Sequence, residues 1–246
     1  MKVSLIDYTG AGSKDPARYA MERLVFTKQT RLNMTPALMS DIENHSTEEL
    51  NIELQYMANT IPSSWEFINY SFLVNDVTRA FTHQLVRTRT GSYAQQTLRV
   101  LDVSGWGYLT GPTIKNDEVN QGLYDDSMKQ IAETYDLLIE RGAAIEDARG
   151  VLPTNILTNI VVKFDLRTLS DTMRKRASSR TQGEYRSVMD AMRKAVLEVH
   201  PFTELFFNRT FDQSASDLEY AILDMNIPSV EKTRLIKLID QMRTTA

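Results

Sequence analysis

Residues 84–99 read Gln-Leu-Val-Arg-Thr-Arg-Thr-Gly-Ser-Tyr-Ala-Gln-Gln-Thr-Leu-Arg. They end a longer stretch, from Val77 to Arg99, that contains four arginines and no acidic residue, although the whole chain has a formal net charge of −4. Guanidinium groups and backbone N–H groups bind phosphate oxygens well. The stretch therefore predicts a binding site for a small anionic ligand. The alternative interpretation is a solvated basic helix end.

A second basic segment, Lys163–Arg186, carries seven positive and three negative charges. Arg167 and Asp171 are four residues apart, so on a helix they would share one face. Taken alone, this pattern is typical of a salt-bridged surface helix. Two separate basic segments in an acidic chain favour a ligand that carries phosphate.

The composition is that of an ordinary globular protein. The chain has 246 residues, of which 42% are hydrophobic and 24% are charged. No apolar run reaches the roughly 18 residues of a membrane-spanning helix, and the N-terminus is too polar for a signal peptide. We therefore expect a cytoplasmic protein with no membrane partner. The acidic balance also argues against a general nucleic-acid-binding protein.

The chain lacks cysteine and has only three histidines, His45, His83 and His200. Disulfides, thiolate metal sites and a cysteine nucleophile are therefore excluded. The histidines lie far apart in the sequence, so no metal site is expected. With so few nucleophilic or imidazole side chains, a bound cofactor would have to supply much of any chemistry.

Hydrophobic periodicity and turn residues predict the secondary structure. Ser46 is expected to cap a helix, with Glu49 as its capping-box partner, and Asp76 is expected to cap another. The expected strands are 2–8 and 67–74, and the expected helices are 15–30, 33–45, 47–59, 77–87, 118–141, 154–163, 166–176 and 184–199. No repeat or low-complexity linker divides the chain, so residues 1–246 are expected to form a single domain.

Several motifs together resemble those of the flavin-dependent thymidylate synthases. Arg87-Thr88-Arg89, followed after seven residues by Thr97, is similar to that family's Arg-His-Arg, seven residues, then Ser. Arg149–Asn155 is similar to its Arg-x-Val-Leu-Pro stretch. Asp165-Leu166-Arg167 stands where the family has Asn-x-Arg, and Arg176, nine residues later, matches its active-site arginine. The order holds from the N-terminus to about residue 200.

The resemblance implies an α+β fold with a small mixed or antiparallel sheet flanked by long helices. It also implies a homotetramer with FAD at the subunit interfaces. Members of the family methylate the pyrimidine deoxynucleotide monophosphate dUMP at C5 to give dTMP. Methylenetetrahydrofolate is the carbon donor and NADPH the reductant. A chain without cysteine suits this family, because the other class of thymidylate synthase activates the pyrimidine with a cysteine.

The resemblance also implies roles for individual residues. Arg176 would face the pyrimidine ring and activate it. The residues implied to contact FAD, some of them from different subunits, are Ser63, Arg87, Thr88, Arg89, Gln95, Asp165, Arg167 and Asp171. Those implied to line the nucleotide are Gln84, Gln95, Gln96, Thr97, Leu98, Arg99, Arg149 and Arg176.

The chain departs from the family pattern around the flavin and the base. Thr88 replaces the signature histidine, Gln95 replaces a glutamate, Asp171 replaces an asparagine and Arg180 replaces a histidine near the pyrimidine. These changes leave C5-hydroxymethylation of dUMP or dCMP open, a reaction that would suit a virus with modified DNA bases. They also leave open a degenerate homologue that binds nucleotide or flavin without turnover. A helical protein that binds another anion is the remaining alternative.

Overall fold

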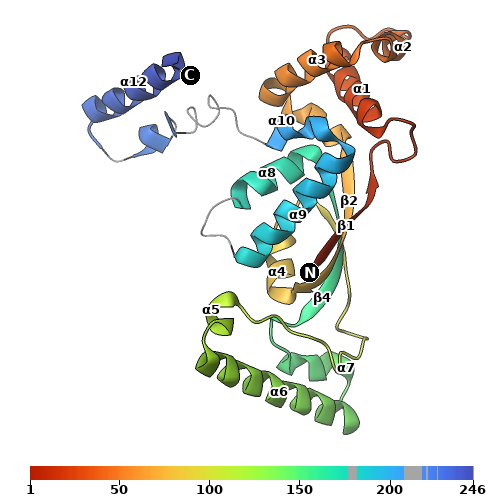
Figure 1. Cartoon of the computed structure of the whole chain (residues 1–246), viewed down its shortest axis with the longest axis vertical. Helices are drawn as coiled ribbons and strands as arrows, with labels where there is room; N and C mark the ends of the chain where they lie inside the picture. The colour runs from red at the N-terminus through yellow and green to blue at the C-terminus, as the bar shows by residue number, and fades with distance from the viewer. Residues whose placement is uncertain (177–181, 208–217, 220, 226, 246) are drawn as a thin grey trace.

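The computed structural model describes residues 1–176, 182–207, 218–219, 221–225 and 227–245. At its centre is a four-stranded antiparallel sheet in the order β1-β2-β4-β3. The strands are β1 (Lys2–Tyr8), β2 (Asn69–Thr78), β3 (Ser92–Gln95) and β4 (Leu157–Asp165). Helices lie against one face of the sheet and at both of its ends (Figure 1), which confirms the expected α+β class and the two expected strands.

Most of the expected helices are present, although their ends differ by a few residues. The helices are α1 (Pro16–Gln29), α2 (Leu38–Glu43), α3 (Thr47–Thr60), α4 (Arg79–Leu85), α5 (Pro112–Lys115), α6 (Glu118–Glu140), α7 (Ile145–Ala148), α8 (Leu166–Arg176), α9 (Gly183–Val199), α10 (Glu204–Phe207) and α12 (Ser229–Thr245). Short 3-10 helices span Pro62–Phe67, Arg149–Val151 and Pro201–Thr203. No helix among the described residues is long and apolar enough to cross a membrane.

The expected helix over residues 154–163 is wrong, because this segment forms strand β4. Thr158, Ile160, Val162 and Phe164 are each at most 1% exposed, so every second residue points into the core. That period of two, together with the β-branched residues, favours a strand over a helix. β4 pairs with both β2 and β3, so it lies inside the sheet. The four-residue strand β3 was not expected at all.

The expected helix cap at Asp76 is also wrong. Strand β2 continues to Thr78, and the side chain of Thr78 caps α4 by accepting a hydrogen bond from the N–H of Phe81 at 3.0 Å. Asp76 lies in an irregularity of β2 with φ of 55°, and its N–H donates to Asn159 Oδ1 at 3.1 Å. Pairing with β4 therefore extends β2 beyond Asp76, so the helix begins after Thr78 instead.

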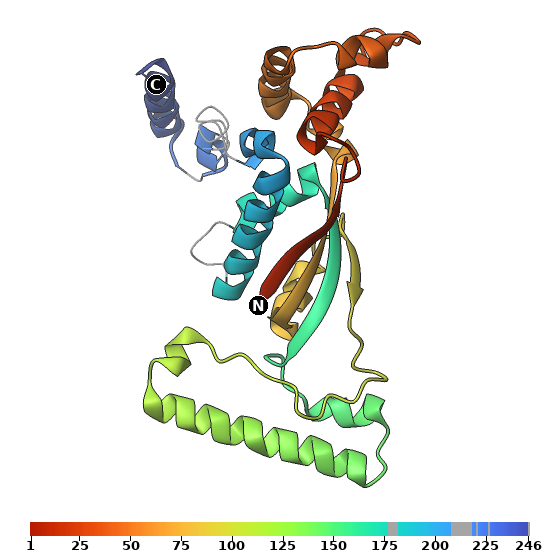
Figure 2. The ribbon, with the colours of Figure 1, turned by 45° about the vertical axis from the view of Figure 1, so that its right-hand side comes forward.

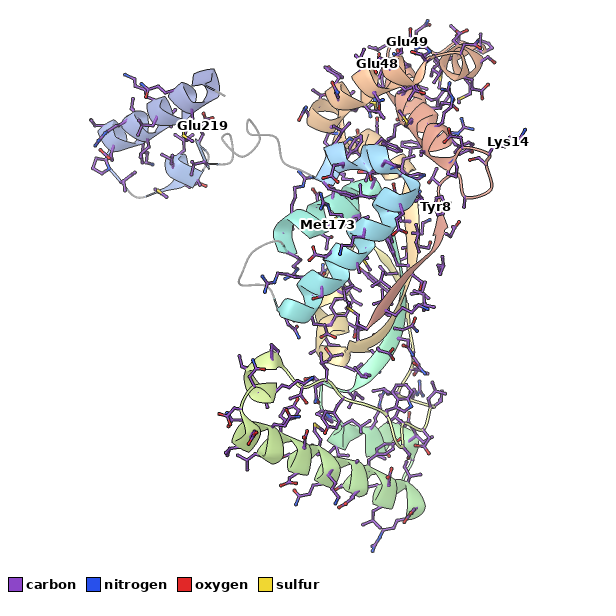
Figure 3. All side chains as sticks on the ribbon, in the orientation of Figure 1. Tyr8, Lys14, Glu48, Glu49, Met173 and Glu219 are labelled. Carbon is purple, nitrogen blue, oxygen red and sulfur yellow. The ribbon has the colours of Figure 1, made fainter. Side chains whose placement is uncertain are left out.

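The buried apolar residues form three separate clusters. The largest lies between the sheet and the helices α1, α3, α4, α8 and α9, with α8 and α9 on the same side of the sheet (Figure 2). The second joins α6 and α7 to the loop after β3, and Tyr135 is 1% exposed there. The third contains Ile222 and Ile239 in the C-terminal segment. Glu219, in the same segment, lies well away from the sheet (Figure 3).

The capping box of α3 predicts a measurable loss of stability on mutation. Ser46 Oγ accepts from the N–H of Glu49 at 3.2 Å, and Glu49 Oε2 accepts from the N–H of Ser46 at 2.7 Å. We expect Ser46→Ala to lower the free energy of unfolding by about 1 kcal/mol, because backbone N–H groups of the first turn lose their partner. Urea denaturation measures this. Thr47→Ala is the control, and equal stability of both variants would contradict the capping role.

Candidate active site

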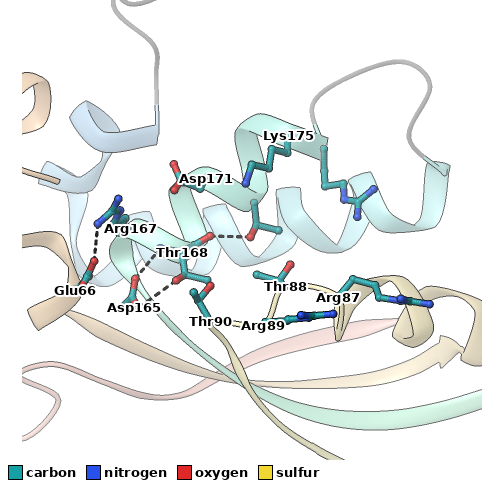
Figure 4. Close-up of a pocket in the computed structure, with 12 residues that line it drawn as sticks. Glu66, Arg87, Thr88, Arg89, Thr90, Asp165, Arg167, Thr168, Asp171 and Lys175 are labelled. Atoms are coloured by element: carbon teal, nitrogen blue, oxygen red, sulfur yellow. Dashed lines mark hydrogen bonds and ion pairs between the residues drawn. The ribbon is translucent and has the colours of Figure 1, made fainter. Parts of the chain in front are cut away.

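A polar cavity of about 890 Å³ lies between α8 and residues 86–91, the loop that joins α4 to β3 (Figure 4). This volume is typical of small-molecule and cofactor sites. The lining residues come from three parts of the chain: Glu66, Arg87, Thr88, Arg89, Thr90, Asp165, Arg167, Thr168, Asp171, Thr172, Lys175 and Arg176. Segments about eighty residues apart in the sequence thus meet at one cavity.

The cavity brings together most of the residues that the sequence motifs assigned to flavin. Those present are Arg87, Thr88, Arg89, Asp165, Arg167 and Asp171, and the expected catalytic residue Arg176 lines the same cavity. Residues of both basic motifs therefore line one cavity within a single chain. Two expected flavin residues lie elsewhere. Ser63 accepts a hydrogen bond from Arg31 at 2.7 Å, and Gln95 donates to Thr82 Oγ1 at 2.9 Å.

The sequence motifs missed five lining residues: Glu66, Thr90, Thr168, Thr172 and Lys175. Helical spacing could have found three of them. Thr168, Thr172 and Lys175 follow each other at four- and three-residue steps, so they share one face of α8 with Asp171.

The acidic residues of the cavity are already engaged within the protein. Glu66 Oε1 forms an ion pair with Arg167 at 2.7 Å, and Asp171 forms one with Arg174 at 2.9 Å. The carboxylate of Asp165 accepts from the N–H of Thr168 at 2.7 Å and so caps the start of α8. These contacts fix one wall of the cavity without neutralising its remaining cations.

Four cationic side chains are left in the cavity without an ion pair to any described residue. They are Arg87, Arg89, Lys175 and Arg176. Arginine and lysine side chains that converge without carboxylate partners are suited to phosphate groups. The hydroxyls of Thr88 and Thr90 beside them can donate further hydrogen bonds to the same oxygens. The cavity therefore has the charge and the donors to hold a diphosphate.

The loop with Arg87 and Arg89 is held in place from strand β3. Tyr93 donates its hydroxyl to the backbone oxygen of Thr88 at 2.6 Å, and the same hydroxyl lies 3.1 Å from the oxygen of Leu85. Burial raises the pKa of Tyr93 to about 12, so the hydroxyl keeps its proton at neutral pH. Tyr93 therefore fixes the backbone between the two arginines.

Gly91 permits this close approach of the loop to the sheet. A Cβ atom at this position would lie 2.5 Å from Phe164 Cε1 and 2.6 Å from the Tyr93 hydroxyl. We therefore expect Gly91→Ala to displace the loop and to lower both the melting temperature and the affinity for flavin. Thermal unfolding and flavin fluorescence measure the two effects. The control is Gly111→Ala, where the added Cβ meets no atom within 4 Å. Unchanged flavin affinity in Gly91→Ala would contradict the prediction.

A carboxylate from α9 connects the start of α4 to the start of α9. Glu184 accepts from the N–H of Thr78 at 2.8 Å and from its hydroxyl at 2.6 Å. An acidic group at this position also stabilises the N-terminal end of the α4 dipole. Gln84, near the other end of α4, donates to Gln182 at 2.6 Å. Two contacts thus fix α4, and with it the arginine loop, to the beginning of α9.

A second hollow of about 250 Å³ contains two of the expected nucleotide residues, Leu98 and Arg149. Arg79 lines the same hollow, and the motifs did not assign it to the site. Burial lowers the pKa of Arg79, and the nearby charge of Arg149 lowers it further. Two guanidinium groups that repel each other in this way would be stabilised by a bound anion. Arg79 belongs to the stretch without acidic residues that begins at Val77. That stretch was the sequence signal that could have assigned Arg79 to an anion-binding site.

Five expected nucleotide residues line neither the polar cavity nor the second hollow in this single chain: Gln84, Gln95, Gln96, Thr97 and Arg99. Arg99 instead pairs with Glu146 at 2.9 Å, and both side chains are at least half exposed. Such a pair contributes little to stability and can exchange for another anion. Gln96 accepts a hydrogen bond from Asn159 at 2.8 Å. Arg180, the replacement for the pyrimidine-side histidine, lies outside the described residues.

Known proteins resemble this chain over most of its length. The sequence model of the family described as thymidylate synthase complementing protein matches residues 4–202. A flavin-dependent thymidylate synthase of Clostridium tetani is 28% identical over 222 residues, which cover 82% of this chain and 84% of that protein. The enzyme of the same name from Nitratidesulfovibrio vulgaris is 32% identical over 197 residues, covering 76% of this chain and 79% of that protein.

A third relative has the same name as these two enzymes. The flavin-dependent thymidylate synthase of Sulfurisphaera tokodaii is 29% identical over 206 residues, with coverage of 82% of this chain and 75% of that protein. The matched region includes both basic motifs and every residue that lines the polar cavity. The chain therefore belongs to the flavin-dependent thymidylate synthases, a family of transferase enzymes.

Proposed function

We propose that this chain methylates dUMP at C5 to give dTMP, with FAD as its cofactor. Methylenetetrahydrofolate would donate the carbon and NADPH the reducing equivalents. The observation that carries the proposal is the polar cavity, where Arg87, Arg89, Lys175 and Arg176 converge without ion pairs to described residues. The same cavity contains the segments that match the family motifs.

The residues of the cavity fit the diphosphate of FAD. Arg87, Arg89 and Lys175 would bind its oxygens, and the hydroxyls of Thr88 and Thr90 would donate to them. When bound, the flavin would supply the reducing equivalents for the new methyl group. The ion pair between Glu66 and Arg167 would form one wall of the site.

Three arginines would hold and activate the nucleotide. Arg79 and Arg149 in the second hollow would bind the 5′-phosphate of dUMP. Their two positive charges repel each other there, and the negative charge of the phosphate would offset this repulsion. Arg176 would donate hydrogen bonds to a pyrimidine carbonyl oxygen. Its positive charge would stabilise negative charge on this oxygen and so polarise the pyrimidine for attack by C5 on the carbon donor.

We also propose that the enzyme works as a homotetramer. Ser63, Gln96, Thr97 and Arg99 lie outside both hollows of the single chain, although the family motifs assign them to ligands. In an assembly these residues could reach a ligand held by a neighbouring subunit. Light scattering of the purified protein, with and without FAD, measures the assembly.

The test is a reaction with purified protein, FAD, methylenetetrahydrofolate and NADPH, with dUMP and dCMP supplied separately. Mass spectrometry identifies the product, and the flavin absorption of the desalted protein reports cofactor binding. We expect retained flavin and dTMP formed from dUMP alone. A hydroxymethylated product from either nucleotide would overturn the proposed reaction but keep the family chemistry. Retained flavin without any product would instead indicate a binding protein.

A further inference from the structure

The ring of Tyr185 lies directly against Arg176. The guanidinium carbon of Arg176 is 4.6 Å from the centre of the Tyr185 ring, within the range of a cation–π contact. Arg176 is the last residue of α8, and Tyr185 lies in the first turn of α9. The contact therefore joins two helices across the segment that connects them.

Little else in the described structure orients this guanidinium. Arg176 forms no ion pair with a described residue, whereas Arg167 and Arg174 in the same helix each have a carboxylate partner. An arginine side chain has several rotatable bonds and loses considerable entropy when it is held in one orientation. The flat face of an aromatic ring can hold the planar guanidinium while leaving its N–H groups free to donate.

Tyr185 is itself held rigidly. The residue is 0% exposed, and its ring packs edge-on against Phe81 of α4 with 5.0 Å between ring centres. Its hydroxyl is buried without a hydrogen-bond partner among the described residues. Burial raises the pKa of this hydroxyl, so the side chain stays neutral. The charge of Arg176 opposes this shift in pKa, so the guanidinium lies close to the hydroxyl as well as over the ring.

We propose that Tyr185 is a positioning residue whose ring face holds the guanidinium of Arg176 in the orientation needed for the pyrimidine. The proposal rests on the proposed function, in which Arg176 activates the base. A displaced activating group costs rate more than substrate binding, because the lost interaction is made mainly in the transition state. The contact should therefore affect kcat more than the KM for dUMP.

The experiment compares Tyr185→Leu with Tyr185→Phe. Leucine removes the ring face, and we expect kcat to fall by roughly tenfold to a hundredfold with little change in KM or flavin absorption. Phenylalanine keeps the ring and removes only the hydroxyl, so kcat should stay near that of the original protein. Phe72→Leu is the matched control, because it removes a buried ring of the same cluster that packs against Tyr70 and not against Tyr185. It should lower the melting temperature while largely preserving kcat.

A second measurement does not depend on activity. The Nε–H proton of Arg176, assigned by NMR with the help of Arg176→Lys, should show a ring-current shift in the original protein and in Tyr185→Phe. The shift should be absent in Tyr185→Leu. Full kcat in Tyr185→Leu, or equal losses in the leucine and phenylalanine variants, would overturn the role of the ring. If the original protein makes no dTMP, the proposed function fails, and the NMR comparison still decides whether the ring holds Arg176.

Discussion

Replacing Arg176 with alanine is expected to lower the kcat for dTMP formation by about a thousandfold, the effect of removing a group that stabilises developing negative charge. Arg176 lines the polar cavity and has no ion pair with a described residue, so its charge remains available to a ligand. The loss should appear in kcat and in kcat/KM alike. Steady-state kinetics with dUMP, together with the flavin absorption of the variant, separate turnover from cofactor binding.

Two further variants make this test specific. Lys175→Ala removes the neighbouring cation of the same cavity, and we expect weaker flavin retention with a much smaller effect on kcat in excess FAD. Arg176→Lys keeps the charge but loses the planar pair of donors, so its kcat should lie between those of the original protein and the alanine variant. Full turnover of Arg176→Ala would show that another residue activates the base.

The second large effect is a loss of stability at acidic pH, caused by His200. This side chain is 0% exposed, and its ring lies among Tyr8, Tyr70 and Phe202. The hydroxyl of Tyr70 lies 2.9 Å from Nδ1, and Nε2 is buried without a described hydrogen-bond partner. Burial raises the pKa of Tyr70, so this hydroxyl can donate to Nδ1 at any moderate pH. The surroundings of His200 therefore favour the neutral imidazole.

Burial lowers the pKa of His200 from 6.5 to about 4. Between these two values the unfolded chain binds a proton that the folded protein excludes, so the free energy of unfolding decreases as the pH falls. The stabilisation is fully present above pH 6.5 and is lost progressively down to about pH 4. The difference in pKa corresponds to about 3 kcal/mol. Urea denaturation at several pH values measures the slope.

A variant that cannot titrate isolates the contribution of His200 from that of the carboxylates. His200→Gln keeps an acceptor for Tyr70, and its stability should change much less between pH 6.5 and pH 4. His45→Gln, at a partly exposed histidine, should retain the slope of the original protein. Parallel slopes for all three proteins would show that His200 does not cause the loss.

Local sequence patterns predicted much of the fold and part of the site. The helix 166–176 agrees with α8 at both ends, and helical spacing correctly placed Arg167 and Asp171 on one face. The capping box at Ser46 is present as expected. These features depend on residues within one or two helical turns, so a single sequence contains the information.

The errors arose where distant segments decide the structure. Residues 154–163 became a strand because β2 and β3 pair with it, and Thr78 replaced Asp76 as a helix cap because the same pairing extends β2. In the site, Tyr185 reaches Arg176 only through the arrangement of two helices, and Glu184 reaches Thr78 across 106 residues. Such contacts leave no periodic signal in the sequence.

The second hollow lies between two separately packed parts of the molecule. Arg79 and His83 belong to α4, beside the main cluster, whereas Leu98 and Arg149 belong to the part that contains α6 and α7. Backbone hydrogen bonds such as Ala80 N to Thr154 O, at 2.8 Å, connect the two parts. A phosphate bound by Arg79 and Arg149 would bridge them. Part of the nucleotide's binding energy would then go into holding the two parts together, so substrate binding would also stabilise the protein against unfolding.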